Sequence, residues 1–451
     1  MSETIKIKRG VDIKLQGTAE QIYANAEMPK TFAIKPTDFL GARLKLAVKE
    51  GDEVKAGSPI LFNKDREAVK FCSPVSGEIA EIVRGEKRKL LEIRILADKE
   101  VKYENFGAAD PKSLDAKAVK EKMLASGCWP FITQRPYNVV ANPERSPKAI
   151  FISCFNSDPI SVDVDFAVHG MEKEFQAGID ALSKLTEGKI HLGLQGGSNP
   201  SSVFANCTGV EKHSFKGPHP AGNVGVQIHK IDPINKGEVV WTVNPENVII
   251  IGRLFLEGKF DASINIAVAG AEVEKPRYHK TIIGANIQGL VEGNVSQNNN
   301  RYISGGVYTG TKIKSDGYLG FYDRQVSVLP EGDQAEFFGW IAPGLDKFSM
   351  SRTMFSWMMP NKKYNLDTGM HGEERAFVVT GEYEKVFPFD IYPVQLLKSI
   401  MVSDIEAMEN LGIYEVVEED MALCEVVCTS KIPVQQVLRE GLDLMLKELG
   451  D

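Results

Sequence analysis

The feature that most constrains the fold is a change of hydrophobic period between residues 148 and 197. Residues 148–159, KAIFISCFNSDP, form a continuous apolar run that ends in a turn, as a buried strand of a parallel sheet does. Residues 172–188, EKEFQAGIDALSKLTEG, then place apolar side chains on one helical face before a terminating Gly188: Phe175, Ile179, Leu182 and Leu185. A second strand, KIHLGLQGG, follows. Two strands joined by a helix predict a Rossmann-like α/β architecture.

Two further segments bear on this α/β unit. Residues 246–260, ENVIIIGRLFLEGKF, are apolar enough to predict that they begin as another buried strand. The dinucleotide fingerprint G-x-G-x-x-G opens no helix of the chain. Residues 194–202, LQGGSNPSS, offer two adjacent glycines after a strand, and both an ordinary loop and a phosphate-binding turn remain open there.

The first hundred residues predict a β-rich unit. Residues 47–62 and 69–83 are strand-like runs punctuated by Gly-Asp, Ala-Gly and Ser-Gly turns. Their pattern resembles the biotinyl/lipoyl-type domain, a flattened barrel of two interlocked sheets. In carrier domains a lysine lies on the hairpin between the two halves, and Lys64 in residues 63–68, NKDREA, is nearest to that position. Lys64 lacks the small or apolar neighbours that carrier enzymes recognise, so we expect no modified lysine.

The remaining sequence predicts two more units. Residues 280–332 are glycine-rich with short alternating strands, which is typical of a small β-grasp-like module. Residues 393–412 and 434–450 show the three-to-four spacing of amphipathic helices. A chain of 451 residues exceeds one hydrophobic core. We therefore expect a multidomain α/β protein with units at 1–103, 104–257, 258–345 and 346–451.

Composition narrows the function classes. The formal net charge of −8 is spread along the chain, which disfavours nucleic acid as the main partner. The charged N-terminus does not resemble a signal peptide. No run reaches the ~18 apolar residues of a membrane span, so membrane contact is expected only through partner subunits. The scattered cysteines predict reduced thiols in a cytoplasmic protein: Cys72, Cys128, Cys154, Cys207, Cys424 and Cys428.

No segment carries a recognisable catalytic or metal motif. Cys424 and Cys428 form a lone C-x3-C pair, too few ligands for a tetrahedral metal or an iron–sulfur cluster. His213 and His219 lie six residues apart in HSFKGPHPAG, which predicts a loop with no metal site. Residues 126–138, SGCWPFITQRPYN, concentrate aromatic rings, prolines and an arginine. That segment has three open interpretations: a cofactor site, a partner surface or core packing.

At the level of the whole chain, the sequence resembles a known family. The quoted segments occur in order from end to end: IKRGVDIKLQGT, VKEGDEVKAG, SPVSGEIAEIVRGEKR, TQRPY, DALSKLTEGKIHL, FKGPHPAGNVG, RLFLEGKF, KTIIGA, YLGFYDRQVSVLPEG, FFGWIAPGLDKFS and DMALCEVVC. They resemble the family of A subunits of the Na⁺-translocating NADH:quinone oxidoreductase (Na⁺-NQR). That family is similar to the C subunit of Rnf complexes and to the flavin-bearing, NADH-oxidising subunit of complex I. The resemblance implies that the third unit is SLBB-like and that the fourth is a degenerate iron–sulfur domain.

The resemblance also implies which cofactors to expect. Flavin-bearing relatives have a glycine-rich loop where this chain has residues 126–138, and Trp129, Phe131 and Tyr137 would fill the volume of a flavin there. Pro130 and Pro136 remove two backbone donors. The Rnf-type cluster motif is reduced to CEVVCTS. We therefore expect no cofactor on this chain, with FAD, FMN, riboflavin and a [2Fe–2S] cluster on other subunits.

The function implied by the family is that of a peripheral subunit on the cytoplasmic side of the inner membrane. The family suggests that the chain docks on the membrane subunits, chiefly the B subunit, of an ion-translocating enzyme. It also suggests that the chain is associated with quinone reduction and that the isolated chain is not catalytic. The alternative is a flavin- and NADH-binding electron-transfer subunit of an Rnf-like complex. Six residues are candidate contacts to the quinone or to a partner: Trp129, Phe131, Arg135, Pro136, Tyr137 and His219. For these residues, core packing and partner docking stay open beside direct quinone contact.

Overall fold

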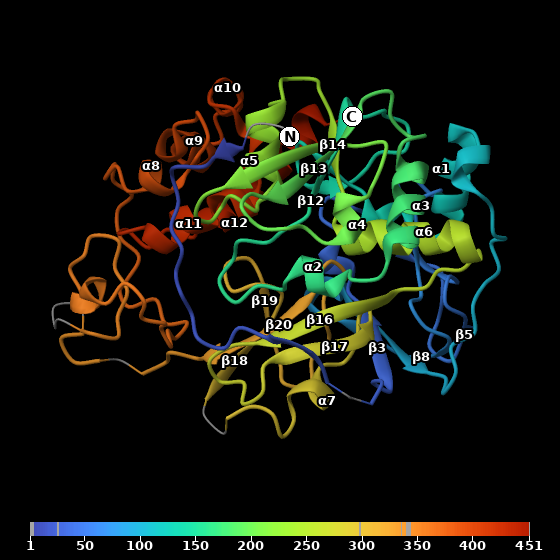
Figure 1. Ribbon diagram of the computed structural model, residues 1–451, viewed down its shortest axis with the longest axis horizontal. Helices are drawn as coiled ribbons and strands as arrows, with labels where there is room; N and C mark the ends of the chain where they lie inside the picture. Colours follow the sequence, from blue (N-terminus) through green and yellow to red (C-terminus); the bar gives the residue numbers. More distant parts are fainter. Residues whose placement is uncertain (1–3, 25–26, 297–298, 335, 340–343, 451) are drawn as a thin grey trace.

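A computed structural model describes residues 4–24, 27–296, 299–334, 336–339 and 344–450. Two large sheets dominate it, one in the upper half and one in the lower half of the view (Figure 1). Both chain ends lie at the top. The quoted family segment at residues 337–349 falls partly outside the described residues, as do the outermost residues of the first and last predicted units.

The upper sheet confirms the α/β prediction. Its strand order is β1-β14-β13-β12-β15-β10-β11. The four central strands are parallel: β12 (Ala149–Ser153), β13 (Lys189–Gln195), β14 (Glu211–Lys216) and β15 (Val240–Thr242). Three short strands extend the upper sheet at its two edges: β10 (Thr133–Arg135), β11 (Val139–Val140) and β1 (Ile5–Lys6). The helices of this unit are α1 (Ala116–Ser126), α2 (Val164–Ala167), α3 (Glu172–Leu182), α4 (Ser202–Ala205), α5 (Val224–Ile231) and α6 (Pro245–Glu257).

The prediction of a strand in residues 246–260 is wrong, because this segment forms helix α6. Pro245 stands in the first turn of the helix, where its missing N–H costs nothing, and Gly258 ends it in a left-handed conformation. Most of its residues are buried, and Arg253, Leu256 and Glu257 near its end reach the surface, so the helix shows no continuous polar face. A helix that is buried along most of its length gives the same continuous apolar run as a buried strand, which is why periodicity misleads here.

Two glycines let α3 and α6 approach each other closely. A Cβ on Gly178 would lie 2.1 Å from the carbonyl oxygen of Val248, and a Cβ on Gly252 would lie 1.8 Å from that of Glu174. Both distances are far below van der Waals contact, so neither position accepts a side chain without moving a helix.

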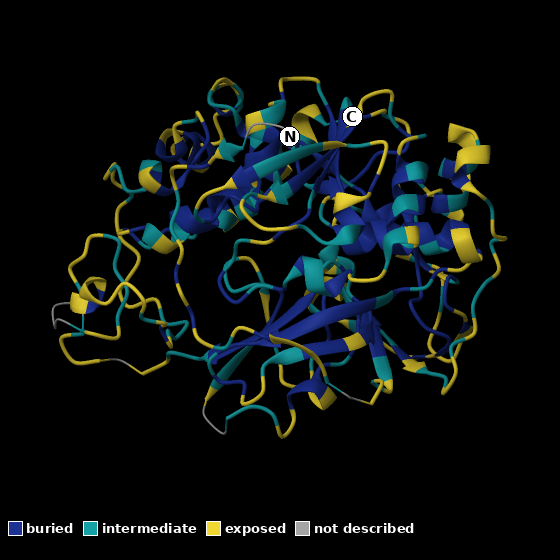
Figure 2. Ribbon diagram, in the orientation of Figure 1, coloured by how far each residue is buried: buried dark blue, intermediate teal, exposed yellow. Residues whose placement is uncertain are grey.

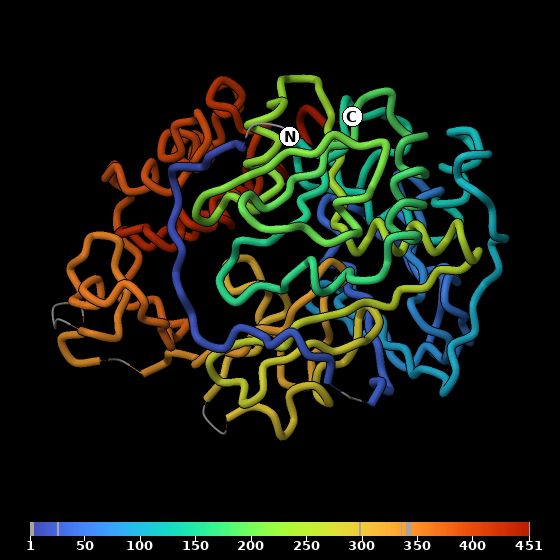
Figure 3. The backbone as a smooth tube through the Cα atoms, viewed as in Figure 1, coloured from blue at the N-terminus to red at the C-terminus, as the bar shows by residue number. Residues whose placement is uncertain are grey.

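The first unit is the predicted barrel-sandwich. It pairs a four-stranded sheet with a three-stranded one: β3 (Thr31–Ile34), β9 (Leu90–Ala97), β8 (Gly77–Arg84) and β5 (Glu53–Val54), against β4 (Leu44–Leu46), β6 (Pro59–Asn63) and β7 (Lys70–Cys72). Lys64 does lie between β6 and β7. The strands before β3 leave this unit: β1 joins the upper sheet and β2 (Glu20–Tyr23) joins the lower one, as the blue end of the tube shows (Figure 3). The predicted unit boundaries themselves stay predictions.

The lower sheet and the C-terminal helices complete the fold. The sheet has the order β19-β18-β20-β16-β17-β2, and its central strands are largely buried (Figure 2), whereas the edge strands β19 and β2 are mostly exposed. Its remaining strands are β16 (Ser263–Ala269), β17 (Arg277–Ile282), β18 (Asn300–Ser304), β19 (Thr311–Ile313) and β20 (Gln325–Pro330), with the short helix α7 (Gln288–Val291). The predicted helical end contains α8 (Tyr383–Val386), α9 (Pro393–Met401), α10 (Ile405–Asn410), α11 (Glu418–Val427) and α12 (Val434–Leu449). Within the described chain, no helix has the length and apolarity to cross a bilayer.

The close contact between α3 and α6 generates a stability prediction. Gly252→Ala should lower the free energy of unfolding by about 1–3 kcal/mol, because overpacking outweighs the better helix propensity of Ala. Gly289→Ala is the matched control, since Gly289 lies in helix α7 with open space around its Cβ position. Urea unfolding of both variants checks this, and equal stability of the two would contradict it.

Candidate functional site

A cavity of about 270 Å³ opens at the carboxyl edge of the upper sheet. Strand β12 has β13 on one side and β15 on the other, so the chain order reverses between β12 and β15. Open α/β sheets bind ligands at such a switch point, beyond the carboxyl ends of the strands. Ser153 and Phe155 line the cavity at the end of β12, and Asn244 and Glu246 line it shortly after β15.

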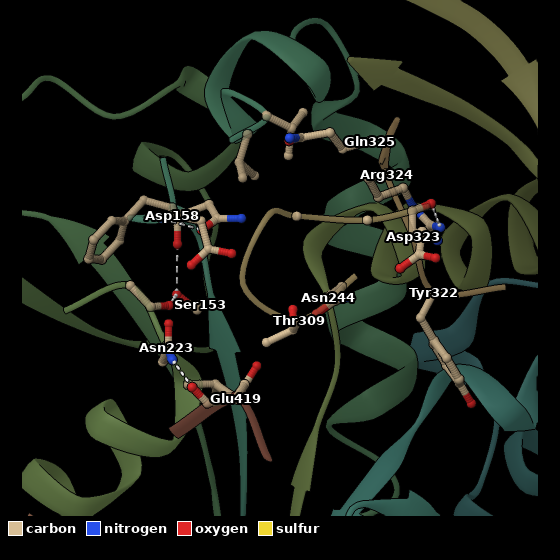
Figure 4. A pocket seen from close by; sticks show the side chains of 18 of the residues that line it. Ser153, Asp158, Asn223, Asn244, Thr309, Tyr322, Asp323, Arg324, Gln325 and Glu419 are labelled. Atoms are coloured by element: carbon tan, nitrogen blue, oxygen red, sulfur yellow. Dashed lines mark hydrogen bonds between the residues drawn. The ribbon is translucent and has the colours of Figure 1, made fainter. Parts of the chain in front are cut away.

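The opposite wall comes from segments far away in the sequence. Figure 4 shows Ser153, Asp158, Asn223 and Glu419 on one side and Tyr322, Asp323 and Arg324 on the other. The cavity is therefore built by the α/β unit, the lower sheet and helix α11 together.

Several wall residues are held in place by hydrogen bonds. Asn223 donates its side-chain N–H to the backbone oxygen of Glu419 at 3.0 Å. Arg324 is buried and donates to the carbonyl oxygens of Phe321 and Asp323 at 3.2 and 2.8 Å, and also to the side chain of Asn247. The walls are thus fixed before any ligand arrives.

The chemically most versatile group in the cavity is the Asp158–His219 pair. The Nδ1 atom of His219 lies 3.1 Å from Asp158 Oδ1 and 3.0 Å from Ser157 Oγ. Burial raises the pKa of Asp158 to about 7 and lowers the pKa of His219 to about 4. The distance alone suggests an ion pair, but desolvation favours the neutral forms, in which a protonated Asp158 donates to Nδ1. This arrangement can hold and move a proton near neutral pH.

Tyr308 connects this cavity to a second one. Its ring lies 5.0 Å from that of His219, and its hydroxyl is buried without a hydrogen-bond partner among the described residues. Tyr308 and Ala422 also line a neighbouring cavity of about 480 Å³. The walls of this second cavity combine apolar and charged side chains. The apolar ones include Ile13, Leu15, Ile303, Leu329, Met370 and Ile432, and the charged ones are Arg301, Lys312, Asp367, Glu425 and Lys431.

Trp129 and Phe131 lie in the core. They form a buried single turn at Trp129–Phe131. The indole of Trp129 donates to the carbonyl oxygen of Ala141 at 2.8 Å and packs edge-on against Trp241. Phe131 stacks on Phe321 with ring centres 4.9 Å apart. Core packing, one of the three interpretations of this segment, accounts for both side chains, while a quinone or partner contact stays a prediction.

Arg135 and Tyr137 join the α/β unit to the C-terminal helices, and Pro136 lies between them in the chain. All three are buried. Arg135 bridges two carboxylates of α11, with Nη1 2.7 Å from Asp420 Oδ2 and Nη2 hydrogen-bonded to Glu419. Of the six candidate residues, His219 lines the cavity, and Arg135 reaches it through Glu419.

Two placements correct or refine the sequence interpretation. The prediction of a loop at His213 is wrong, because His213 lies on strand β14; His219 follows that strand in a turn. Cys424 and Cys428 are buried free thiols at the end of α11, and burial raises the pKa of Cys424 well above its usual value.

The sequence analysis missed Asp158 and Tyr308. A signal existed for Asp158, because polar residues that follow a predicted parallel strand lie at its carboxyl end, where ligands bind. Nothing local marks Tyr308, which reaches the cavity only because the lower sheet packs against the α/β unit.

The buried carboxyl of Asp158 predicts a pH-dependent difference in stability. Its folded-state pKa of about 7 lies above the roughly 3.9 of an unfolded Asp, so its stabilising contribution is full below pH ~4 and is lost as the pH rises to about 7. The wild-type chain should therefore lose about 2 kcal/mol of unfolding free energy between pH 5 and pH 8 through this group. Asp158→Asn has no carboxyl at this position and should not show this loss. Urea unfolding at both pH values measures this. The exposed Asp316→Asn serves as control, and parallel pH profiles for wild type and Asp158→Asn would refute the prediction.

Comparison with known proteins agrees with this architecture. Three family models match the chain: the NqrA N-terminal barrel-sandwich hybrid domain at residues 5–98, the NqrA second alpha/beta domain at 114–260 and the NQRA C-terminal domain at 265–315. A chain of NAD⁺-reducing [NiFe]-hydrogenase in the air-oxidized state aligns with a TM-score of 0.39 at 10% identity, covering 74% of this chain and 61% of its own, and this likeness carries no argument.

Curated relatives match over nearly the full length. The A subunit of the Na(+)-translocating NADH-quinone reductase of Vibrio anguillarum is 38% identical over 447 residues, covering 98% of this chain and 100% of the relative. The protein of the same name from Neisseria meningitidis serogroup A is 37% identical with the same coverage. The chain therefore belongs to the NqrA family, the A subunits of Na⁺-translocating NADH-quinone reductases.

Proposed function

We propose that this chain is a peripheral subunit that helps to form the quinone site of a Na⁺-translocating NADH:quinone reductase and carries no redox cofactor of its own. It docks on the cytoplasmic side of the membrane subunits, chiefly the B subunit. The observation that carries this proposal is a pair of adjoining cavities that meet at Tyr308, a smaller one rich in polar groups and a larger one whose walls contain more apolar side chains.

The two cavities suit the two ends of a quinone. A quinone headgroup needs hydrogen-bond donors for its carbonyl oxygens, and the unpartnered hydroxyl of Tyr308 and the ring of His219 supply them. The protonated Asp158 beside His219 offers a proton to a reduced headgroup. The apolar side chains of the second cavity suit the isoprenoid tail. A quinone with an isoprenoid tail is polar at its headgroup and apolar along its tail, so its two ends match the two cavities.

The buried turn at residues 129–131 argues against a flavin on this chain. The turn Trp129–Phe131 is packed against Trp241 and Phe321 and offers no glycine-rich approach to a phosphate. We assign FAD, FMN, riboflavin and the [2Fe–2S] cluster to other subunits. An isolated chain with stoichiometric flavin absorbance would favour the Rnf-like electron-transfer alternative.

An exposed apolar segment supports docking. Residues 337–339 and 344–359 carry large apolar side chains in water, including Phe337 at 87% exposure and Trp357 at 51%. Phe338, Phe355, Met358 and Met359 are exposed as well. Clusters of aromatic and Met side chains on a surface are typical of protein interfaces. In the proposed complex, a membrane subunit covers this segment.

The quinone proposal predicts the behaviour of Tyr308→Phe in the assembled complex. Loss of one hydroxyl donor should raise the KM for quinone about three- to ten-fold, the value of one hydrogen bond, while assembly is retained. Tyr302→Phe is the control, because Tyr302 lies on strand β18 and lines neither cavity. Steady-state kinetics with purified complex measure both, and an unchanged KM in Tyr308→Phe would refute direct headgroup contact.

The docking proposal predicts the loss of this subunit from the complex. The double variant Phe355→Ser, Trp357→Ser should leave the thermal stability of the isolated chain unchanged, because both side chains are about half exposed, but should reduce its co-purification with the membrane subunits. Leu256→Ser is the matched control, since Leu256 is similarly exposed on helix α6. Full retention of the double variant in the purified complex would contradict this assignment.

A further inference from the structure

Three metal-ligating side chains gather on the upper sheet, away from the cavity. Strands β13 and β14 are parallel neighbours, and their register sets His191 beside Glu211. His213 follows two residues later on β14, so its side chain emerges on the same face as that of Glu211. The two histidines and the glutamate thus form one group on one face of the sheet.

The distances within this group suit a single ion. His191 Nδ1 lies 2.9 Å from His213 Nε2 and 3.7 Å from Glu211 Oε2. One ligand atom from each residue lies within 4.8 Å of the other two. Zinc binds nitrogen at about 2.0–2.1 Å, so two nitrogens in a tetrahedral site are roughly 3.3 Å apart. Small side-chain rotations bring all three atoms to that spacing.

The surroundings orient the ligands and leave the site open. The His191 ring is stacked on Phe151, with centres 4.6 Å apart, and is nearly buried. The other oxygen of Glu211 pairs with Lys189, which directs Oε2 towards the histidine. Among the described residues, β1 pairs only with Phe215 and Lys216 of β14, and the side chain of Glu211 is 45% exposed. An ion can therefore reach the group from solvent.

We propose that His191, Glu211 and His213 form a binding site for a divalent transition-metal ion of the zinc class, with water as the fourth ligand. Imidazole and carboxylate ligands favour Zn²⁺ and its neighbours over Mg²⁺ or Ca²⁺. On binding, each imidazole gives the ion a lone pair from the nitrogen that faces the other ring, and the ring that donates the hydrogen bond in the metal-free chain moves its proton to its other nitrogen. The ion replaces the imidazole–imidazole hydrogen bond and links β13 to β14.

The test is metal titration of the full-length chain. We expect one Co²⁺ per chain with the intense visible absorption of a tetrahedral site, its displacement by Zn²⁺, and a Zn²⁺-dependent rise in Tm. His213→Gln and Glu211→Gln should each weaken Zn²⁺ binding at least ten-fold. His169→Gln is the control, because His169 is an exposed histidine of the same unit outside the group.

The variants distinguish lost ligands from lost structure. Glu211 is half exposed, so Glu211→Gln should keep the Tm of the metal-free wild-type chain. The proposal is overturned if Co²⁺ gives no tetrahedral spectrum. It is also overturned if His213→Gln and Glu211→Gln bind Zn²⁺ as tightly as His169→Gln. In either case the two histidines serve only to hydrogen-bond each other.

Discussion

The buried guanidinium of Arg135 ties the α/β unit to the C-terminal helices. It is 2% exposed, so the cost of removing its charge from water is offset only because two carboxylates of α11 meet it. Asp420 also accepts the backbone N–H of Val417 at 3.0 Å, which fixes the first turn of α11. Gly225 has to be a glycine, since a Cβ there would lie 2.3 Å from both Arg135 and Asp420. Because Glu419 lines the cavity, this ion cluster also sets one wall of the site.

The cavity follows from how the units pack. Most of the described buried apolar residues of the first three units form one continuous cluster, and the C-terminal helices form a second cluster that includes Tyr137, Val139 and Phe215 of the α/β unit. A small third cluster lies within the α/β unit around Phe151 and Val240. The site lies where the two large clusters meet, at the switch point of the upper sheet. Its lining contains the titratable groups Asp158, His219 and Glu419.

Much of the fold was predictable from local pattern, and the failures have specific causes. The run at 148–159 and the helix after it carry clear signals, because β12 is buried on both faces and α3 has one polar face. Helix α6 was mistaken for a strand because it lacks a continuous polar face. In the candidate site, His219 is the one residue of the six predicted contacts that lines the cavity, and its role there stays a prediction. Trp129 and Phe131 were correctly singled out as bulky, but their packing depends on Trp241 and Phe321, which are distant in sequence.

The amino-acid sequence by itself determined the local elements and the family to which the chain belongs. It also showed that residues 126–138 contain no glycine-rich phosphate loop. All of these depend on residue type and on spacing along the chain. The tertiary structure alone decided that Arg135 meets Asp420, 285 residues away, and that Tyr308 lies beside His219. It also decided that His191 and Glu211 share a register. Contacts of this kind depend on which strands pair and which faces pack, and hydrophobic periodicity specifies the buried face of an element but not its partner.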